Sequence, residues 1–268
     1  MDLGLSGNRV IVTGGASHIG RAIVLGMAGE GAHVVIVDRD VEQADATAKA
    51  ARARGAAGAT VVGADLSATP NVIEAMKRAM DALGGVDTLV NNVGGASRPD
   101  FFSKLTPADW EKELTLNLMS PTVATSAVLP QMVAQKGGCV VSTSSVSAWG
   151  EPRSAVYGAA KAGVMSLMRA LAKEHGRDNI RFNSIAPGPV VPSEGDSDTF
   201  GSGSVWTNPK ALWNDDEQLR SVMRQAPLRR LATAEDIANS VLFFASPRVA
   251  TALTGQVLAV SCGFGMPS

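Results

Sequence analysis

Residues 9–20, RVIVTGGASHIG, indicate the fold of this chain. The first part, Arg9–Thr13, is a short β-branched run of the kind that forms a buried strand. Gly14 and Gly15 then permit a tight turn, and a helical pattern begins near Ile19. A strand, a glycine turn and a helix in this order can hold the pyrophosphate of a dinucleotide on backbone N–H groups at the start of the helix. A lone glycine turn is a weak signal, so a simple strand-to-helix connection is the alternative.

The same alternation of strands and helices continues along the chain. Short apolar strands that alternate with helices are typical of a parallel sheet whose two faces are covered by helices. We find no internal repeat and no linker, and predict one α/β domain over residues 1–268. Further strands are expected at His33–Val37, Thr60–Gly63, Thr88–Val90, Cys139–Thr143, Ile180–Ile185 and Gln256–Val260, and helices at about Val41–Arg54, Asn71–Leu83, 107–135 with a restart at Ser120-Pro121, Ala155–His175 and 234–246.

Composition narrows the classes of function. The chain has 268 residues and a net charge of −1, and it shows no basic stripe, so neither nucleic acid nor an anionic membrane is an expected partner. Its start lacks a secretory signal, and no apolar run approaches the roughly 20 residues that span a bilayer. Cys139 and Cys262 are far apart, and the three histidines are scattered, so we expect no metal site. A soluble, reduced, cytoplasmic protein is the expectation.

Acidic residues after the second and third strands point to the type of dinucleotide. Asp38 ends the second strand about 20 residues after the glycine turn, where a carboxylate suits the ribose hydroxyls of NAD and repels the 2′-phosphate of NADP. Arg39 could instead accept that phosphate, and Asp38 could be a plain solvated turn residue. We predict NAD, with Asp65 and Leu66 beside the adenine.

Several polar or glycine residues are expected at a single edge of the sheet. In an open parallel sheet, ligands bind beyond the carboxyl ends of the strands. Five positions follow the ends of predicted strands and therefore predict the site, namely Gly14, Asp38, Asp65, Asn92 and Ser145.

Residues 138–161, GCVVSTSSVSAWGEPRSAVYGAAK, predict the chemistry. Tyr157, the only tyrosine, precedes Lys161 by four residues, so both lie on one face of the predicted helix. A free phenol has a pKa near ~10, and a neighbouring ammonium should lower it toward the range in which acid–base catalysis is efficient. Ser144 and Ser145 end the preceding strand, where one hydroxyl could bind the substrate oxygen. The alternative is an amphipathic helix with an ordinary tyrosine and an exposed lysine.

Two further features have open interpretations. Asn117, inside the helical region 107–135, is either a structural cap at the break or a group that holds an active-site water. The segment Ser193–Ser204, within the region around 190–215, is rich in Gly, Ser and Asp, and the region carries Phe200 and Trp206. A long loop of this kind is often an active-site lid, and an unimportant surface insertion is the alternative.

With these motifs the chain resembles the short-chain dehydrogenase/reductase family over nearly its whole length. The resemblance implies a single Rossmann-type domain with a seven-stranded parallel sheet, a homotetramer or dimer, and hydride transfer at the nicotinamide. The motifs are TGGASHIG at 13–20, Asp38, Asp65-Leu66, NNVG at 91–94, Asn117, the serine pair, YGAAK at 157–161, Pro187-Gly188 and LTGQVLAV at 253–260.

The resemblance also implies residue roles. Tyr157 would be the catalytic acid/base, Lys161 would lower its pKa and bind the nicotinamide ribose, and Asn117 would hold a water of the proton relay. The serine would orient the substrate oxygen. The cofactor would contact Gly14, Ser17, His18, Ile19, Gly20, Asp38, Asp65, Leu66, Asn92, Tyr157, Lys161, Pro187 and Val190, and the substrate would contact Ser145, Trp149, Tyr157, Phe200 and Trp206.

The choice between the two serines depends on how residues are counted. Counting along the strand from Gly138 selects Ser145, whereas counting back thirteen residues from Tyr157 selects Ser144. We predict Ser145, because a loop one residue shorter than usual reconciles the two counts.

The chain departs from the family pattern at three places. His18 stands at the middle glycine of the family's turn, and its imidazole could lie along the phosphates. Pro192 stands where a threonine is common, and Ser261-Cys262-Gly263 replaces Asp-Gly-Gly.

We predict an NAD(H)-dependent oxidoreductase that interconverts a secondary alcohol and a ketone of a bulky, mostly apolar substrate. The first rival is a catalytically silent dinucleotide-binding subunit or regulator of the same fold. The second is a lyase of this fold such as a halohydrin dehalogenase. That rival is disfavoured because such proteins resemble this family but lose the glycine turn, which Gly14 and Gly20 keep here, and carry Arg in place of Lys161.

Overall fold

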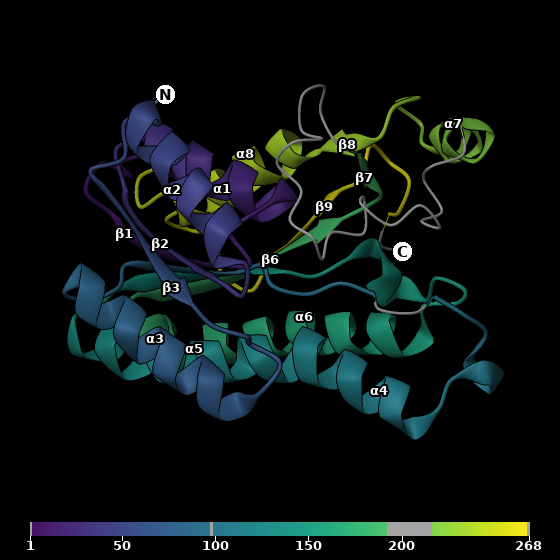
Figure 1. Cartoon of the computed structure of the whole chain (residues 1–268), viewed down its shortest axis with the longest axis horizontal. Coiled ribbons are helices and arrows are strands. Elements are labelled where there is room, and N and C mark those ends of the chain that lie inside the picture. Colours follow the sequence, from purple (N-terminus) through teal and green to yellow (C-terminus); the bar gives the residue numbers. More distant parts are fainter. Residues whose placement is uncertain (1, 97–98, 192–215, 267–268) are drawn as a thin grey trace.

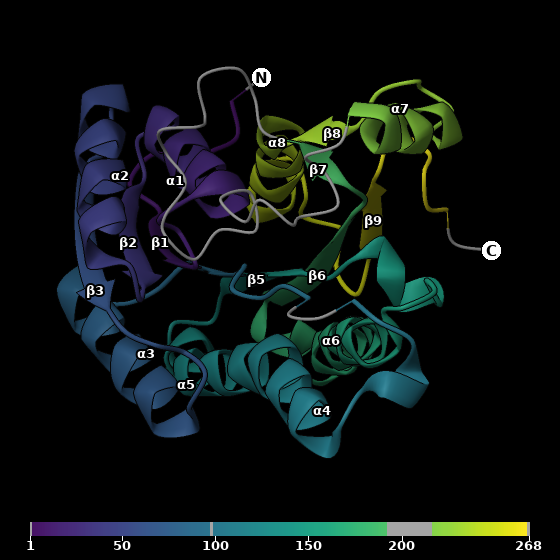
Figure 2. The same ribbon diagram turned by 45° about the vertical axis from the view of Figure 1, so that its right-hand side comes forward.

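Seven parallel strands form the central sheet, in the order β3-β2-β1-β4-β5-β6-β9 (Figures 1 and 2). The computed structural model describes residues 2–96, 99–191 and 216–266. The predicted parallel α/β sheet is therefore confirmed, and its order reverses direction between β1 and β4, where such sheets bind ligands. The strands are β1 (Arg9–Thr13), β2 (His33–Asp38), β3 (Gly58–Gly63), β4 (Thr88–Asn91), β5 (Gly138–Thr143), β6 (Ile180–Pro187) and β9 (Val257–Val260).

Helices cover both faces of this sheet (Figures 1 and 2). Alternate residues of a strand point to opposite faces, so Val34 and Ile36 join the apolar core on one side of the sheet while Val35 and Val37 join the core on the other. Because helices exclude water from both faces of the sheet, the central residues of β1 and β2 are continuously apolar and do not alternate with polar residues. One layer holds α1 (His18–Gly29), α2 (Val41–Arg54) and α8 (Ala234–Ala245), and the other holds α3 (Thr69–Leu83), α4 (Pro107–Leu114), α5 (Ser120–Ala134) and α6 (Ala155–His175).

Two helices begin with reciprocal capping pairs. Thr106 accepts the N–H of Asp109 at the start of α4, and the Asp109 carboxylate accepts the N–H of Thr106 in return. Thr233 and Asp236 form the same reciprocal pair at the start of α8. Each pair satisfies backbone donors that a helix otherwise leaves open.

The expected restart at Ser120-Pro121 takes the form of a π-helical segment. Residues Thr115–Met119 form five residues of π-helix that join α4 to α5, and the Ser120 N–H donates to the carbonyl of Thr115, five residues back. Pro121 has no N–H to donate to the carbonyl of Asn117, four residues back. Short π segments often occur at functional sites, and this one carries Asn117.

Three of the described α-helices and β-strands were not predicted. Helix α7 (Asp216–Gln225) is one, and the others are β7 (Val190–Val191) and β8 (Ala232–Thr233), which pair in parallel as a second, two-stranded sheet. Most of the predicted lid around 190–215, with Phe200 and Trp206, lies outside the described residues and stays a prediction.

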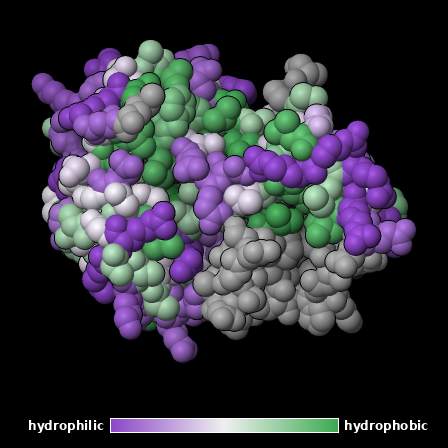
Figure 3. Space-filling view, turned by 90° about the horizontal axis from the view of Figure 1, so that it is seen from above, coloured by the Kyte–Doolittle hydropathy of each residue, from purple (hydrophilic) through white to green (hydrophobic). Residues whose placement is uncertain are grey.

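The outer surface mixes polar and apolar residues. Seen from above, hydrophilic and hydrophobic residues are interspersed over the described part of the surface (Figure 3). Among the described helices, none combines the length and the apolar character that crossing a bilayer requires.

Candidate active site

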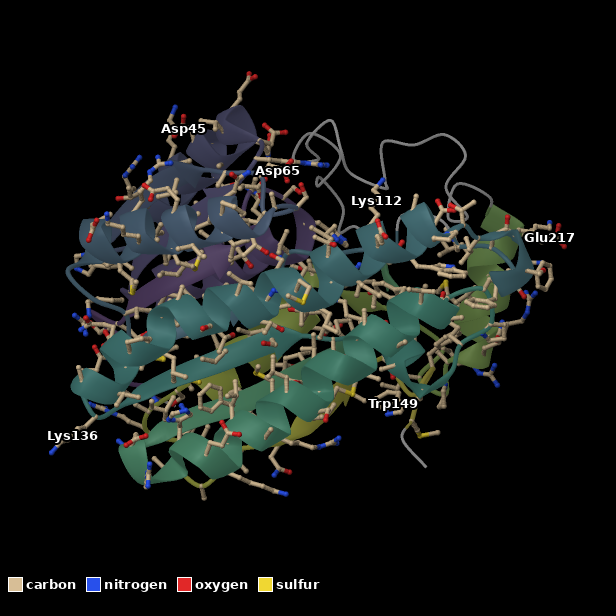
Figure 4. All side chains as sticks on the ribbon, turned by 90° about the horizontal axis from the view of Figure 1, so that it is seen from below. Asp45, Asp65, Lys112, Lys136, Trp149 and Glu217 are labelled. Carbon is tan, nitrogen blue, oxygen red and sulfur yellow. The ribbon has the colours of Figure 1, made fainter. Side chains whose placement is uncertain are left out.

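The strand register brings the predicted site residues to one edge of the sheet. Thr13 is paired with Asn91 across β1 and β4, and Asn91 with Ser142 across β4 and β5. The segments that follow these three strands therefore leave the sheet side by side. In Figure 4, Lys136, just before β5, lies at one end of the molecule, and Trp149, which follows the strand, lies well away from it.

The glycine turn after β1 approaches its neighbours too closely for a side chain. Gly14 has a left-handed φ of 66°, and a Cβ atom at this position would lie 3.1 Å from Cα of Val93. A Cβ atom at Gly20 would lie 1.8 Å from the carbonyl oxygen of Gly14. The Asn92 amide closes the turn from β4, because its Nδ2 donates to the carbonyls of Thr13 and Gly14. This bare backbone at the start of α1 fits the phosphates of a dinucleotide.

The backbone conformation at His18, the middle position of the turn, is one that glycine adopts more easily than other residues. His18 begins α1 with a φ of 47°, a left-handed conformation that costs most non-glycine residues free energy. Ser17 is the N-cap residue of α1, and its side chain makes no capping hydrogen bond. Ile19 follows in the first turn, partly buried. Ser17, His18 and Ile19 all lie where a bound pyrophosphate is expected.

The carboxylate of Asp38 lies beside the glycine turn. Its Oδ2 accepts the N–H of Ala16 at 3.0 Å, and its Oδ1 accepts the N–H of Asp40 at 3.1 Å. After β3, Asp65 is exposed (Figure 4) and Leu66 is buried. The hydrogen bond from the Ser67 N–H lowers the pKa of Asp65. Pro187 ends β6 and Val190 begins β7, so both predicted cofactor contacts lie at the same edge of the sheet.

Tyr157, Lys161 and the serine pair converge where β5 meets α6. Tyr157 shares a hydrogen bond with the hydroxyl of Ser145. The hydroxyl of Ser144 instead donates to the backbone carbonyl of Lys161 at 2.8 Å. Lys161 is only 3% exposed; its Nζ donates to the carbonyl of Thr143 at 2.8 Å and lies 5.8 Å from the centre of the Tyr157 ring. Tyrosine, lysine and Ser145 thus form one connected cluster.

The expected lowering of the tyrosine pKa is wrong, because the pKa of Tyr157 is raised. Burial raises the pKa of Tyr157 to about 12, the hydrogen bond with Ser145 opposes that change, and the charges of Glu113 and Glu151 add to it. Burial also lowers the pKa of Lys161 to about 8, against the pull of Glu113. Desolvation of the two groups therefore outweighs the expected lowering of the tyrosine pKa by the neighbouring ammonium.

Asn117 reaches this cluster from the π-helical segment. Its side chain is fully buried, its Oδ1 accepts the N–H of Gly95 at 2.9 Å, and its Nδ2 donates to the Gly95 carbonyl at 3.1 Å. The same Nδ2 also donates to the carboxylate of Glu113 at 2.9 Å. Of the two interpretations of Asn117, the structural one finds direct support in these bonds, and they also place its side chain beside the Lys161 end of the cluster.

Two acidic residues of the site were missed from the sequence. Glu113 precedes Asn117 by four residues, and this helical spacing is a signal that places the two side chains together. Glu151 accepts the hydroxyl of Ser147 at 2.5 Å. Glu151 lies in a loop, where no sequence pattern indicated its place in the site. Trp149, predicted to contact substrate, ends a 3₁₀ turn and is 38% exposed.

Comparisons with known proteins agree with this geometry. The sequence model of the short chain dehydrogenase family matches residues 8–199. The chain is 35% identical over 263 residues to (2S)-[(R)-hydroxy(phenyl)methyl]succinyl-CoA dehydrogenase subunit BbsD of Thauera aromatica, covering 97% of each chain.

Two solved structures extend the likeness to the fold. One is a 7α-hydroxysteroid dehydrogenase complexed with NADH and 7-oxo glycochenodeoxycholic acid, with a TM-score of 0.86, 30% identity, and coverage of 99% of this chain and 97% of that one. The other is the NADH-dependent reductase A1-R′ complexed with NAD, with a TM-score of 0.83, 25% identity and full coverage of both chains. The chain belongs to the short-chain dehydrogenase family and is an oxidoreductase of that family.

Proposed function

We propose that this protein is an NAD(H)-dependent oxidoreductase that interconverts a secondary alcohol and a ketone of a bulky, mostly apolar substrate. The observation that carries the proposal is the convergence of Ser145, Tyr157, Lys161 and Asn117 beside the glycine turn, at one edge of the sheet. A bound nicotinamide cofactor would supply or accept the hydride.

The chain's own residues would handle the proton and the substrate oxygen. The raised pKa keeps the Tyr157 phenol neutral at pH 7, and the neutral phenol is the form that can donate a proton to a ketone oxygen. The Ser145 hydroxyl, already hydrogen-bonded to Tyr157, would hold the same oxygen. In alcohol oxidation the phenol must ionise first, and the Lys161 ammonium next to it favours the phenolate.

The choice of NAD over NADP is supported by the position of Asp38. Its carboxylate lies against the glycine turn, where its charge would repel a 2′-phosphate and its oxygens suit ribose hydroxyls. The two solved structures named above are complexes with NADH and with NAD. An aromatic succinyl-CoA thioester and an oxo bile acid appear in the names of a relative and a neighbour, which supports a bulky substrate.

To test the proposal, the protein is mixed with NADH, or separately with NADPH, and with one ketone from a panel of cyclic, aromatic, steroidal and acyl-thioester compounds. The loss of absorbance of the reduced cofactor then measures turnover. We expect turnover of one class with NADH preferred, and a loss of at least 100-fold in kcat for Tyr157→Phe with unchanged NADH binding. Near wild-type turnover by Tyr157→Phe would refute the mechanism. Tight NADH binding without turnover of any ketone would favour the silent dinucleotide-binding subunit.

A further inference from the structure

Glu113 carries a carboxylate that is almost completely buried beside the candidate catalytic residues. It lies in the last turn of α4, is 7% exposed, and its Oε2 accepts the Nδ2–H of Asn117 at 2.9 Å. Burying a carboxylate is costly unless charge and hydrogen bonds compensate for the lost water. The surroundings of Glu113 should therefore hold a compensating positive charge, and they do.

One such charge is the ammonium of Lys161. The attraction of Glu113 raises the pKa of Lys161 against the stronger effect of burial, so the two charges stabilise one another across the contact between α4 and α6. Asn117 stands near this pair. A Cβ atom at Gly94 would lie 2.7 Å from Oδ1 of Asn117 and 2.9 Å from Nζ of Lys161, so amide and ammonium flank the same bare glycine.

The hydrogen bond also reinforces the direction in which the Asn117 amide faces, which backbone bonds to Gly95 and to the Glu113 carbonyl already favour. An ionised carboxylate only accepts hydrogen bonds, so it requires the NH₂ group of Asn117 on its side. The amide oxygen is then left for the Gly95 N–H, which it accepts at 2.9 Å. With an uncharged apolar residue at position 113, the amide would keep its backbone partners, the Gly95 N–H and the carbonyls of Gly95 and of residue 113, but would lose its charged acceptor.

We propose that Glu113 is a positioning residue of the proton-transfer site: its buried carboxylate fixes the amide of Asn117 and balances the charge of the Lys161 ammonium. The role of Glu113 in catalysis rests on the proposed function. The effect of its charge on Tyr157 and Lys161 can be tested without any substrate. The charged groups that act on Tyr157 and Lys161 among the described residues are Glu113 from α4 and Glu151 from the loop before α6.

The single tyrosine makes a direct measurement possible. Tyr157 is the only tyrosine, so phenolate absorbance titrates this one side chain in the intact protein. The charge of Glu113 raises the pKa of Tyr157, so its removal in Glu113→Gln should lower that pKa from about 12. We expect a shift of roughly 1 pH unit, read by rapid pH jump before alkaline unfolding. Glu111→Gln, an exposed residue on the same helix, is the matched control and should titrate like the wild type.

A titration of Glu113→Gln that superimposes on that of Glu111→Gln would overturn the inference, whether or not a substrate has been found. With a substrate in hand, the pH profile of kcat should move to lower pH in both directions of the reaction, while KM for NADH stays unchanged. Should Glu113→Gln be too unstable to titrate, the double variant E113Q/K161M decides. It should fold again if the two charges balance one another, and its failure to do so would contradict the proposal.

Discussion

The hydroxyl of Ser144 donates a 2.8 Å hydrogen bond to the backbone carbonyl of Lys161, and this bond joins the carboxyl end of β5 to α6. The next residue, Ser145, hydrogen-bonds Tyr157 instead. Successive residues of an extended chain point in opposite directions, so one serine serves the scaffold and the other faces the site. Counting along the sequence did not decide which serine is catalytic, and these two hydrogen bonds support Ser145 as the predicted catalytic serine.

The two serines should therefore respond differently to alanine substitution. Ser145→Ala removes a hydroxyl from the reacting oxygen, and we expect kcat to fall by about 100-fold with little change in stability. Ser144→Ala leaves a buried carbonyl without its donor, which should cost about 1 kcal/mol of unfolding free energy and less than ~10-fold in kcat. Urea unfolding and steady-state kinetics on the same preparations measure both effects, and the reverse pattern would assign catalysis to Ser144.

Lys161 should lower the stability of the protein near neutral pH. Its folded pKa of about 8 lies below its ordinary value of 10.5, so between these values the unfolded chain binds more protons and stability rises with pH. Lys161→Met removes this cost. After allowance for the lost bond to Thr143 and for the buried Glu113 carboxylate, which loses its counter-charge, we expect a smaller net gain on the order of 1 kcal/mol at pH 7 that shrinks as the pH rises toward about 10. Urea titrations of the inactive variant across this range test the sign, and a gain that grows with pH would contradict it.

The left-handed backbone at His18 should be a local source of strain. His18→Gly and His18→Ala both remove the imidazole, but only glycine adopts a φ of 47° without a steric penalty. We expect the glycine variant to be more stable than the alanine variant by about 1 kcal/mol. Thermal unfolding of the pair measures this difference, and equal melting temperatures would show that the turn relaxes. NADH titrations of both variants would show whether the imidazole contributes to cofactor binding.

Asp38 should control the choice between NADH and NADPH. Asp38→Ser removes the negative charge beside the glycine turn and keeps a short side chain that can accept the Ala16 N–H. We expect the preference for NADH over NADPH, measured as a ratio of kcat/KM, to fall by at least about 10-fold. Arg39→Ala is the complementary variant, and it should weaken NADPH use if that guanidinium binds the phosphate. An unchanged ratio in Asp38→Ser would remove Asp38 as the selector.

The sequence alone determined those parts of the protein in which neighbouring residues act together. The apolar β-branched runs predicted all seven strands of the main sheet, with ends within a few residues of the observed ones, because strands buried on both faces have a strong local pattern. The helix Ala155–His175 was predicted with its exact bounds, and the glycine turn followed from the absence of side chains at Gly14 and Gly20.

Only the tertiary structure decided how charge and hydrogen bonds are distributed within the site. Tyr157 and Lys161 were paired by their spacing, but the direction of their pKa shifts depends on burial, and burial arises from elements distant in the sequence. The same holds for Ser144 and Glu113, whose partners appear once α4, α6 and β5 pack together. Local sequence specifies backbone conformation through short-range sterics, whereas desolvation and electrostatics depend on every group that packing brings near.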